Sequence, residues 1–317
     1  MNILVGGLIG LSVTIVTLFN FAFTSAINRE IMHLRGDIFY AVLILGIITN
    51  LFAALFFLSF FRASVTSPGR IPDFPPWNLV NPTEDLKAVE AKRGGGERFC
   101  RHEGKYKPDR CHHCSQCQAC TLRMDHHCPW LDNCVGFWNY KFFVLTLSYA
   151  ILTLLFITAC CSWFGHFISK QHSPLGVEVA RLVVGIVLAS VSGIIAAVLC
   201  LFFAIHVTMM RKGVTTLEVF EKQRNEDFGN EESCLGPLCC EPKDPTTRKP
   251  INPSIYKLPS AIDNYKAALG EDVWWWWFPS VPSMKVGSAD GLKFATFHNR
   301  STRVIEQGDD SPLIERS

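Results

Sequence analysis

Cysteine and histidine concentrate in one short part of the chain, between residues 100 and 141. It holds seven of the 13 cysteines and five of the ten histidines: Cys100, Cys111, Cys114, Cys117, Cys120, Cys128, Cys134, His102, His112, His113, His126 and His127. Such a density is typical of a disulfide framework or of zinc binding. The interleaved histidines favour zinc, because zinc takes both thiolate and imidazole ligands and a disulfide framework has no use for imidazole.

The spacing of these residues is sufficient for two interleaved zinc sites. Zinc in a structural site takes four ligands in a closed tetrahedron, and a Cys-x2-Cys step supplies two of them from one turn. The candidate ligands are Cys100, His113, Cys114, Cys117, Cys120, His127 and Cys134.

Asp125, His126 and Cys128 remain when both sites are filled, and they form an acid, imidazole and thiol set. Nucleophilic cysteine chemistry needs a base for the thiol proton and a third group that orients the imidazole. If residues 125–128 are extended, alternation puts His126 and Cys128 on one face and His127 on the other. His127 would then bind zinc while His126 stays free as a base. The alternative is that His126 and Cys128 are spare ligands of one distorted finger.

The motif Asp125-His126-His127-Cys128, followed by Pro129-Trp130 and Asn133-Cys134-Val135-Gly136, resembles the signature of the DHHC cysteine-rich protein S-acyltransferases, or palmitoyltransferases. The upstream Lys107-Pro108-Asp109-Arg110 and the downstream Asn139-Tyr140-Lys141-Phe142-Phe143 are similar to motifs of the same family. The resemblance therefore implies an enzyme that transfers acyl groups to protein cysteines.

This resemblance also implies roles for individual residues. Cys128 would accept a palmitoyl or other long-chain acyl group from acyl-CoA as a thioester and pass it to cysteines of membrane-associated proteins near the bilayer. His126 would be its base and Asp125 the orienting carboxylate. Two structural zinc ions would be held by Cys114, Cys117, His127 and Cys134, and by Cys100, His113, Cys120 and a fourth ligand.

That fourth ligand is where the chain departs from the family pattern, which has a cysteine three residues after Cys100. This chain has Glu103 at that position. His102, Glu103 and Cys111 are all candidates, since zinc accepts nitrogen, carboxylate oxygen and sulfur. We favour His102, and the departure leaves the catalytic set unchanged.

The composition indicates a membrane protein. The chain of 317 residues is 49% hydrophobic, with a mean hydropathy of +0.20. The net charge of +2 gives no reason to expect nucleic acid as a partner, and no basic recognition helix accompanies the cysteine-rich stretch.

Four apolar runs, at 3–26, 38–61, 142–168 and 182–208, are each long enough to cross a bilayer as a helix. A cleaved signal peptide is the alternative for the first run, but no basic segment precedes it and the run is too long. The predicted fold is therefore an all-α integral membrane protein. Four transmembrane helices would carry a small, irregular two-zinc cytosolic domain, at about 98–141, between helices 2 and 3.

These runs divide the chain into five parts. We expect helices 1 and 2 in 1–61, the cytosolic loop with the zinc domain in 62–141, helices 3 and 4 in 142–208, a cytosolic tail in 209–285, and a disordered polar end in 286–317.

The basic residues predict the orientation. The links 26–37 and 169–181 carry two Lys or Arg each, whereas the loop 62–141 carries 12 and the tail after residue 208 carries 14. The positive-inside rule places the loop and both termini in the cytosol, where zinc-binding and catalytic thiols also stay reduced. We therefore expect a multi-pass membrane protein that is located in the ER, the Golgi or the plasma membrane.

Two segments of the tail also resemble family motifs. Val214 to Glu218 is similar to a Thr-Thr-x-Glu motif, which suggests that Thr216 and Glu218 pack beside the catalytic loop. Asn264 to Gly270, followed by Trp274 to Trp277, resembles a C-terminal motif, and tryptophans suit the lipid headgroup region. Three further cysteines, Cys234, Cys239 and Cys240, are expected to be free thiols, with acylation as the alternative.

A second function class has to be weighed, namely a membrane-anchored zinc adaptor or ubiquitin-ligase-like scaffold. The Asp125, His126 and Cys128 set argues against it, because a scaffold needs no acid, base and thiol beyond its zinc ligands.

Overall fold

The computed structural model describes residues 14–16, 19–20, 36–74, 77, 98–169, 177–226, 256–285, 290–292 and 294. Most of the predicted first span, at 3–26, lies outside these residues. Cys234, Cys239 and Cys240, and nearly all of the tail 286–317, also lie outside them.

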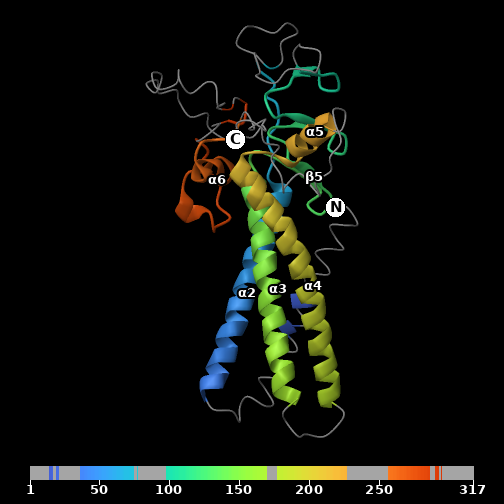
Figure 1. The fold of residues 1–317 in the computed structure, drawn as a ribbon, viewed down its shortest axis with the longest axis vertical. Coiled ribbons are helices and arrows are strands. Elements are labelled where there is room, and N and C mark those ends of the chain that lie inside the picture. Colours follow the sequence, from blue (N-terminus) through green and yellow to red (C-terminus); the bar gives the residue numbers. More distant parts are fainter. Residues whose placement is uncertain are drawn as a thin grey trace, which may run out of the picture.

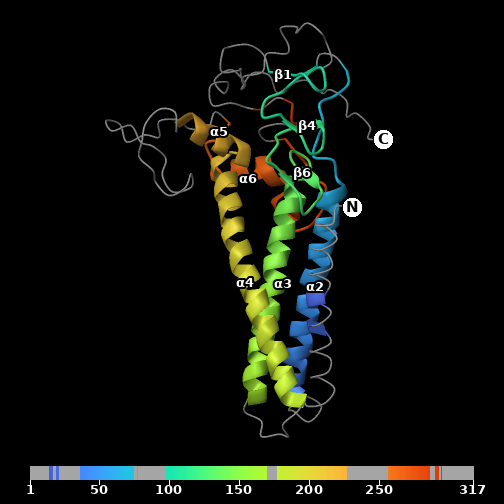
Figure 2. The same ribbon diagram turned by 90° about the vertical axis from the view of Figure 1, so that its right-hand side faces the viewer.

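Three long helices form one half of the molecule (Figures 1 and 2). They are α2 (Gly36–Val65), α3 (Tyr140–Ser169) and α4 (Val177–Lys212). Within them Leu43–Val65, Tyr140–Trp163 and Leu182–Lys212 are long and apolar enough to cross a membrane. The last three predicted spans are therefore confirmed in length and composition, which indicates a membrane protein.

The outer surface of these helices is apolar, as a lipid-facing surface requires. Leu51 on α2 is 55% exposed, and Ile194 and Leu201 on α4 are 67% and 71% exposed. In water such residues would be an unusual patch, whereas in a bilayer they meet hydrocarbon.

Small and hydroxyl side chains mark the contact between α3 and α4. A Cβ atom added at Gly193 would come within 3.5 Å of the Thr158 methyl group, and the hydroxyl groups of Thr158 and Ser192 lie 2.7 Å apart. Close approach through small residues is a common way for membrane helices to pack, and Gly193 allows it here.

The described residues of the N-terminal segment lie against the same bundle. Ile15 and Phe19 are buried in one cluster with Ile157 of α3. Asn20 and Asn50 exchange hydrogen bonds of 3.1 and 2.9 Å between their side-chain amides. Asn50 therefore bonds to a neighbouring segment, as polar side chains inside apolar helices commonly do.

The cysteine-rich part consists of three antiparallel hairpins, so the prediction of an all-α fold with an irregular zinc domain is wrong there. The strands pair as β1 (Phe99–Cys100) with β2 (Lys105–Tyr106), β3 (His112–Cys114) with β4 (Ala119–Thr121), and β5 (His126–Cys128) with β6 (Asn133–Val135). Strands of two or three residues are too short to show an alternating apolar pattern in a sequence. Isolated hairpins of this length are also unstable in water, so other contacts must hold them.

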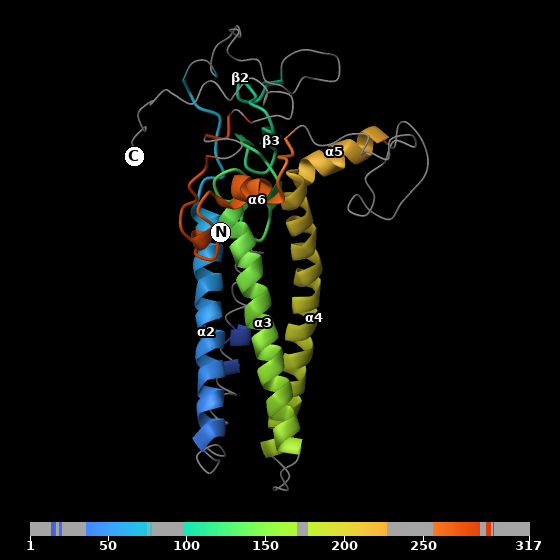
Figure 3. The ribbon, with the colours of Figure 1, turned by 60° about the vertical axis from the view of Figure 1, so that its left-hand side comes forward.

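The hairpins sit at one end of the helix bundle, where α5 (Thr216–Glu226) and α6 (Ala261–Leu269) also lie (Figure 3). A buried core joins these parts. Its members come from the third hairpin, the ends of α2, α3 and α4, and α6: Cys128, Leu131, Val135, Phe60, Ala63, Phe142, Phe143, Met210 and Leu269.

The third hairpin is tied to the end of α2 by hydrogen bonds. The Asn133 amide donates to the carbonyl oxygens of Ser64 at 3.0 Å and Thr66 at 2.9 Å. The Asn139 amide donates to the carbonyl of Ala63 at 3.2 Å. The last carbonyls of a helix lack partners within it, so these two amides cap α2 and fix the hairpin over the bundle.

Candidate active site and metal centres

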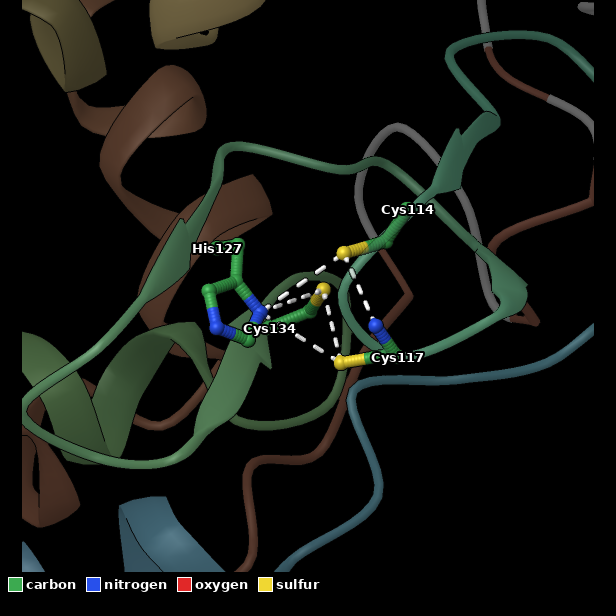
Figure 4. A group of neighbouring side chains, drawn as sticks. All are labelled: Cys114, Cys117, His127 and Cys134. Carbon is green, nitrogen blue, oxygen red and sulfur yellow. Dashed lines mark hydrogen bonds between the residues drawn. The ribbon is translucent and has the colours of Figure 1, made fainter. Parts of the chain in front are cut away.

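Four side chains from the second and third hairpins converge on one point (Figure 4). The His127 Nδ1 lies 3.6 Å from the sulfur of Cys114, 3.4 Å from that of Cys117 and 3.8 Å from that of Cys134. The Cys117 and Cys134 sulfurs are 3.5 Å apart. A tetrahedron with metal–sulfur bonds of about 2.3 Å and a metal–nitrogen bond of about 2.1 Å has edges of about 3.5–3.8 Å. The donor set therefore fits a zinc ion without rearrangement.

A second group lies between the first and second hairpins. The His113 Nδ1 is 3.6 Å from the Cys100 sulfur and 3.7 Å from the Cys120 sulfur, and the three ligand atoms lie within 4.8 Å of one another. His102 lies outside this group, since its exposed ring stacks on that of His113 at 4.6 Å between centroids. The structure thus brings together seven of the eight predicted ligands in two groups.

The three hairpins repeat one another at a constant interval in the sequence, a relationship that our reading of the sequence missed. The interval is the separation in sequence between Cys114 and Cys128. When the residue numbers of β3 and β4 are increased by this interval, they become those of β5 and β6. The strand partners His113 and Cys120 then correspond to the partners His127 and Cys134. The equal spacing of the ligands was the signal that could have revealed this repeat.

The turns of the hairpins follow the same repeat. Gly104, Gln118 and Asp132 occupy one position in the three turns, and their φ angles are all positive, at 64°, 52° and 51°. The backbone of each hairpin therefore reverses in the same way.

The repeat explains why the Cys128 thiol is left over. Cys100, Cys114 and Cys128 occupy the same position in successive hairpins. In the third hairpin Leu131 replaces the second ligand, Cys117, and packs into the apolar core beside Cys128. Among the described residues Cys128 is in neither ligand group, and it is only 6% exposed.

β5 is extended, which meets the condition for the predicted alternation of side chains. His127 joins the metal-ligand group, whereas His126 turns its Nδ1 to the carboxylate of Asp125 at 2.7 Å. His126 also interacts with the Cys128 thiol. Because Nδ1 faces Asp125, Nε2 is the ring atom left for the thiol, which is the arrangement that a base needs.

Asp125 is 1% exposed and lies at the N-terminus of α5. The backbone N–H of Thr216 donates to its Oδ1 at 3.0 Å and the Thr216 hydroxyl to its Oδ2 at 2.8 Å. Burial raises the pKa of this carboxyl, but the hydrogen bond with His126 and the contact with Thr216 outweigh it and lower the pKa to about 2. Asp125 is therefore a fixed anion.

The pKa of His126 is shifted in the opposite direction to that of Asp125. Burial lowers its pKa, but the hydrogen bonds with Asp125 and Cys128 outweigh burial and raise the pKa to about 9. An imidazole in this setting accepts a proton readily, and Asp125 holds it in one tautomer and one orientation. Asp125, His126 and Cys128 can thus act as an orienting carboxylate, a base and a nucleophile.

Thr215 and Glu218 begin α5 with a capping box, the reciprocal pair of bonds that closes a helix N-terminus. The Thr215 N–H donates to the Glu218 carboxylate at 3.0 Å, and the Glu218 N–H donates to the Thr215 hydroxyl at 3.3 Å. This cap places Thr216 on Asp125, so the predicted position of Thr216 and Glu218 beside the catalytic loop is confirmed.

Arg110 is a residue for which the sequence indicated no role. Its guanidinium donates to both carboxylate oxygens of Glu218, at 2.6 and 2.9 Å, and lies over the ring of Tyr256 at 4.6 Å. The pair links the hairpins to α5, and its side chains are 5% exposed at Arg110 and 17% exposed at Glu218.

The C-terminal segment reaches the same end of the bundle. The Lys141 ammonium at the start of α3 donates to the carbonyl and the hydroxyl of Ser280, at 3.1 and 3.0 Å. Asn264 of α6 is buried and bonds the backbone of Leu258 in both directions at 2.9 Å. Trp274 of the same segment is 90% exposed.

The chain was compared with models of known protein families. The profile of the DHHC palmitoyltransferase family covers residues 94–223, which include all three hairpins, α3, α4 and the start of α5.

Curated proteins are also similar to part of the chain. The chain is 43% identical over 140 residues to Palmitoyltransferase ZDHHC15A of Danio rerio, covering 44% of this chain and 42% of the relative. It is 38% identical over 149 residues to Palmitoyltransferase ZDHHC15 of Homo sapiens, covering 47% and 43%. It is 32% identical over 213 residues to Palmitoyltransferase ZDHHC2 of Danio rerio, covering 67% and 51%.

The chain spans about half the length, or slightly less, of these relatives. The matched part holds both ligand groups and the Asp125, His126 and Cys128 set. Residues 94–223 of the chain thus form a domain of the DHHC palmitoyltransferase family.

Proposed function

We propose that the protein is a protein-cysteine S-palmitoyltransferase that carries a long-chain acyl group on Cys128. One observation carries this proposal above the others. A buried thiol lies outside both metal-ligand groups and interacts with an imidazole whose second nitrogen is held by a buried carboxylate.

The first step would load the enzyme. Because the pKa of His126 is raised to about 9, its Nε2 holds the proton taken from Cys128 as an imidazolium, and the Cys128 sulfur attacks the thioester carbonyl of acyl-CoA. The bond between the carbonyl carbon and the CoA sulfur then breaks, and the CoA sulfur receives the proton from His126. The products are acyl-Cys128 and free CoA, and Asp125 stabilises the imidazolium while it exists.

The second step would transfer the acyl group. His126 takes the proton of a substrate cysteine, whose sulfur attacks the carbonyl of acyl-Cys128. The bond to the Cys128 sulfur breaks, and His126 returns the proton to that sulfur. A substrate therefore has to present a cysteine at the depth of Cys128, as a protein associated with the membrane surface does.

The surroundings of Cys128 suit a long acyl chain. The thiol packs among Phe142 and Phe143 at the start of α3 and Phe60 near the end of α2. An acyl chain on Cys128 would extend along these helices into the hydrocarbon, while the CoA group remains in water. Burial of each CH₂ group contributes about 0.8 kcal/mol, which favours long chains.

Both ligand groups would hold structural zinc, since their thiol and imidazole donors are those zinc prefers. One ion would bind Cys114, Cys117, His127 and Cys134. The other would bind Cys100, His113, Cys120 and a fourth ligand. Zinc would supply cross-links that hold the short hairpins, and His126 and Cys128 would keep their catalytic role.

The proposed topology has four membrane spans, with the segment 3–26 as the first, and the zinc domain and both termini in the cytosol. The division at residues 61, 141, 208 and 285 and the disordered end at 286–317 belong to the same proposal. Exposed Trp274 and Trp277, beside the bundle end, support a membrane surface at this level. An endomembrane of the ER or Golgi, or the plasma membrane, would be the location.

The test is acyl transfer in a defined system. Purified protein in liposomes receives labelled palmitoyl-CoA and a lipid-anchored acceptor peptide with one cysteine, with Cys128→Ala and His126→Ala as variants and zinc content measured on each. We expect hydroxylamine-labile label on the acceptor with the wild type only. If both variants keep their zinc and transfer as fast as the wild type, the enzyme proposal fails and a zinc adaptor or ubiquitin-ligase-like scaffold becomes the better account.

A further inference from the structure

The ligand group of the first two hairpins has three members from Cys and His, one fewer than its counterpart. Moving the complete group of Cys114, Cys117, His127 and Cys134 back by one hairpin repeat, so that Cys114 falls on Cys100, gives positions 100, 103, 113 and 120. Three of these positions hold the expected ligands. The fourth holds Glu103, at the place of Cys117.

The backbone around Glu103 has the geometry of a metal-binding turn. In the complete group the N–H groups of Gln116 and Cys117 point to the Cys114 sulfur. In the first hairpin the N–H groups of His102 and Glu103 point to the Cys100 sulfur in the same way. The first hairpin thus presents residue 103 as the second hairpin presents Cys117.

The Glu103 carboxylate, like His102, lies outside the group of Cys100, His113 and Cys120, but it contacts Cys120. Its Oε1 accepts the Cys120 N–H at 3.0 Å, and the carboxylate also interacts with the Cys120 thiol. Its Oε2 is buried and has no hydrogen-bond partner among the residues that the structure describes. A buried carboxylate oxygen without a partner is costly, and a metal ion would satisfy it.

From this we propose that Glu103 is the fourth ligand of the Cys100, His113 and Cys120 centre, which is then a zinc site of two thiolates, one imidazole and one carboxylate. The inference rests on the proposed zinc centres and is independent of the acyl transfer. It replaces our sequence-based preference for His102.

The net charge of the zinc centre supports Glu103 over His102 as the fourth ligand. A zinc ion with three thiolates and one imidazole has a net charge of −1. Two thiolates, an imidazole and the Glu103 carboxylate give the same −1, whereas His102 as fourth ligand would give a neutral centre. His102 is also exposed, and its ring lies flat against that of His113, tilted by 13°.

Cys111 is the remaining competitor, because its thiol also interacts with Cys120. Its position does not fit the repeat, because its counterpart in the next hairpin is Asp125, which bonds His126 and lies outside the complete group. Cys111 is 0% exposed and packs in the apolar cluster around Ile71 and Phe137. The same cluster holds Cys100 and Cys120, so the position in the repeat, and not burial, separates Cys111 from the ligands.

The test measures metal binding by the full chain in detergent. The metal is removed with a chelator, and the protein is titrated with Zn²⁺ against a chromophoric competitor and, separately, with Co²⁺. The variants are Glu103→Gln and Glu103→Cys, with His102→Ala and Cys111→Ala as matched controls. Glutamine keeps the length of the side chain and its bond to Cys120, so only the anionic ligand is lost.

We expect two zinc ions per chain in the wild type. Glu103→Gln lowers the affinity of one site at least tenfold, since even partners outside the ligand shell contribute about 10–100-fold to metal affinity. Glu103→Cys restores tight binding and strengthens the sulfur-to-Co²⁺ charge-transfer band, because one thiolate is added. Both controls bind like the wild type.

Wild-type affinity in Glu103→Gln together with loss of a site in His102→Ala or Cys111→Ala would overturn the inference and name the true ligand. An unchanged charge-transfer band in Glu103→Cys would overturn it as well. Fewer than two zinc ions in the wild type would instead refute the zinc centres on which it rests.

Discussion

Thr216 donates two hydrogen bonds to the Asp125 carboxylate across a separation of 91 residues, one from its backbone and one from its hydroxyl. The bonds join the start of α5 to the catalytic hairpin. Asp125 in turn holds His126, so the orientation of the proposed base depends on a helix beyond the last membrane span.

Replacing Thr216 by Val removes the hydroxyl bond and keeps the shape of the side chain. A hydrogen bond to a charged group contributes about 1.5–3 kcal/mol, so acylation of Cys128 is expected to slow by roughly 10-fold to 100-fold. Thr216→Ser, which keeps the hydroxyl, is the control and retains most of the rate. Equal rates of single-turnover acylation in the Val variant and the wild type would show that this bond does not position the site.

Asp125→Asn removes the charge that stabilises the His126 imidazolium. The pKa of His126 is expected to fall from about 9 toward the ordinary value of 6.5, as burial then dominates. The measurement is an NMR titration of ¹³C-labelled histidine in detergent. Asp132→Asn, which alters an exposed carboxylate of the same hairpin, leaves the His126 titration unchanged.

The raised pKa of His126 also predicts a pH dependence of stability. A pKa above its unfolded value stabilises the folded protein fully below about pH 6.5, and the stabilisation is lost as the pH rises through about 9. The melting temperature of the wild type should therefore fall between these values. The fall should be smaller in Asp125→Asn, and an identical fall in both proteins would assign it to other groups.

The Arg110 and Glu218 pair predicts a stability effect at a distance from the thiol. Glu218→Gln preserves the capping box but removes the carboxylate charge that faces the buried Arg110, which costs up to about 3–5 kcal/mol, the loss on breaking a fully buried pair. The double variant Arg110→Met/Glu218→Gln is expected to lose less than the sum of the two single losses. The exposed pair of Lys105 and Asp73 is the control, since Asp73 is 89% exposed and Asp73→Asn costs about 1 kcal/mol or less.

Removal of zinc is expected to unfold the hairpins while the helices stay folded. Chelation leaves strands of two or three residues without cross-links, so the hairpins unfold and acylation stops. The helices α2 to α4 are held by their own apolar packing, so the helical circular dichroism is retained. Returning zinc restores acylation, and a fully active metal-free protein would contradict the structural role of both centres.

Local rules of the sequence predicted much of the candidate site. Alternation along an extended chain was enough to separate His127 from His126 and Cys128, because the rule acts over three residues. The three described spans were predicted to within about five residues at each end, since long apolar runs identify them and charged residues such as Arg62 and Lys141 lie close to their ends.

Contacts between distant segments could not be predicted from composition or spacing. The bond between Lys141 and Ser280 joins residues 139 apart in sequence, and the Arg110 and Glu218 pair joins residues 108 apart. The preference for His102 over Glu103 came from ligand chemistry alone, because the orientation of the Glu103 carboxylate depends on the fold of the first hairpin.

The most direct test of the account is to locate the acyl group after one turnover. Wild-type protein and Cys128→Ser are incubated with palmitoyl-CoA without an acceptor, digested, and analysed by mass spectrometry before and after hydroxylamine. The account predicts a hydroxylamine-labile palmitoyl adduct on the peptide with Cys128, none on Cys114 at the equivalent position of the second hairpin, and none in the variant. An adduct that persists in Cys128→Ser, or a wild type without any adduct, would contradict the central role of this thiol.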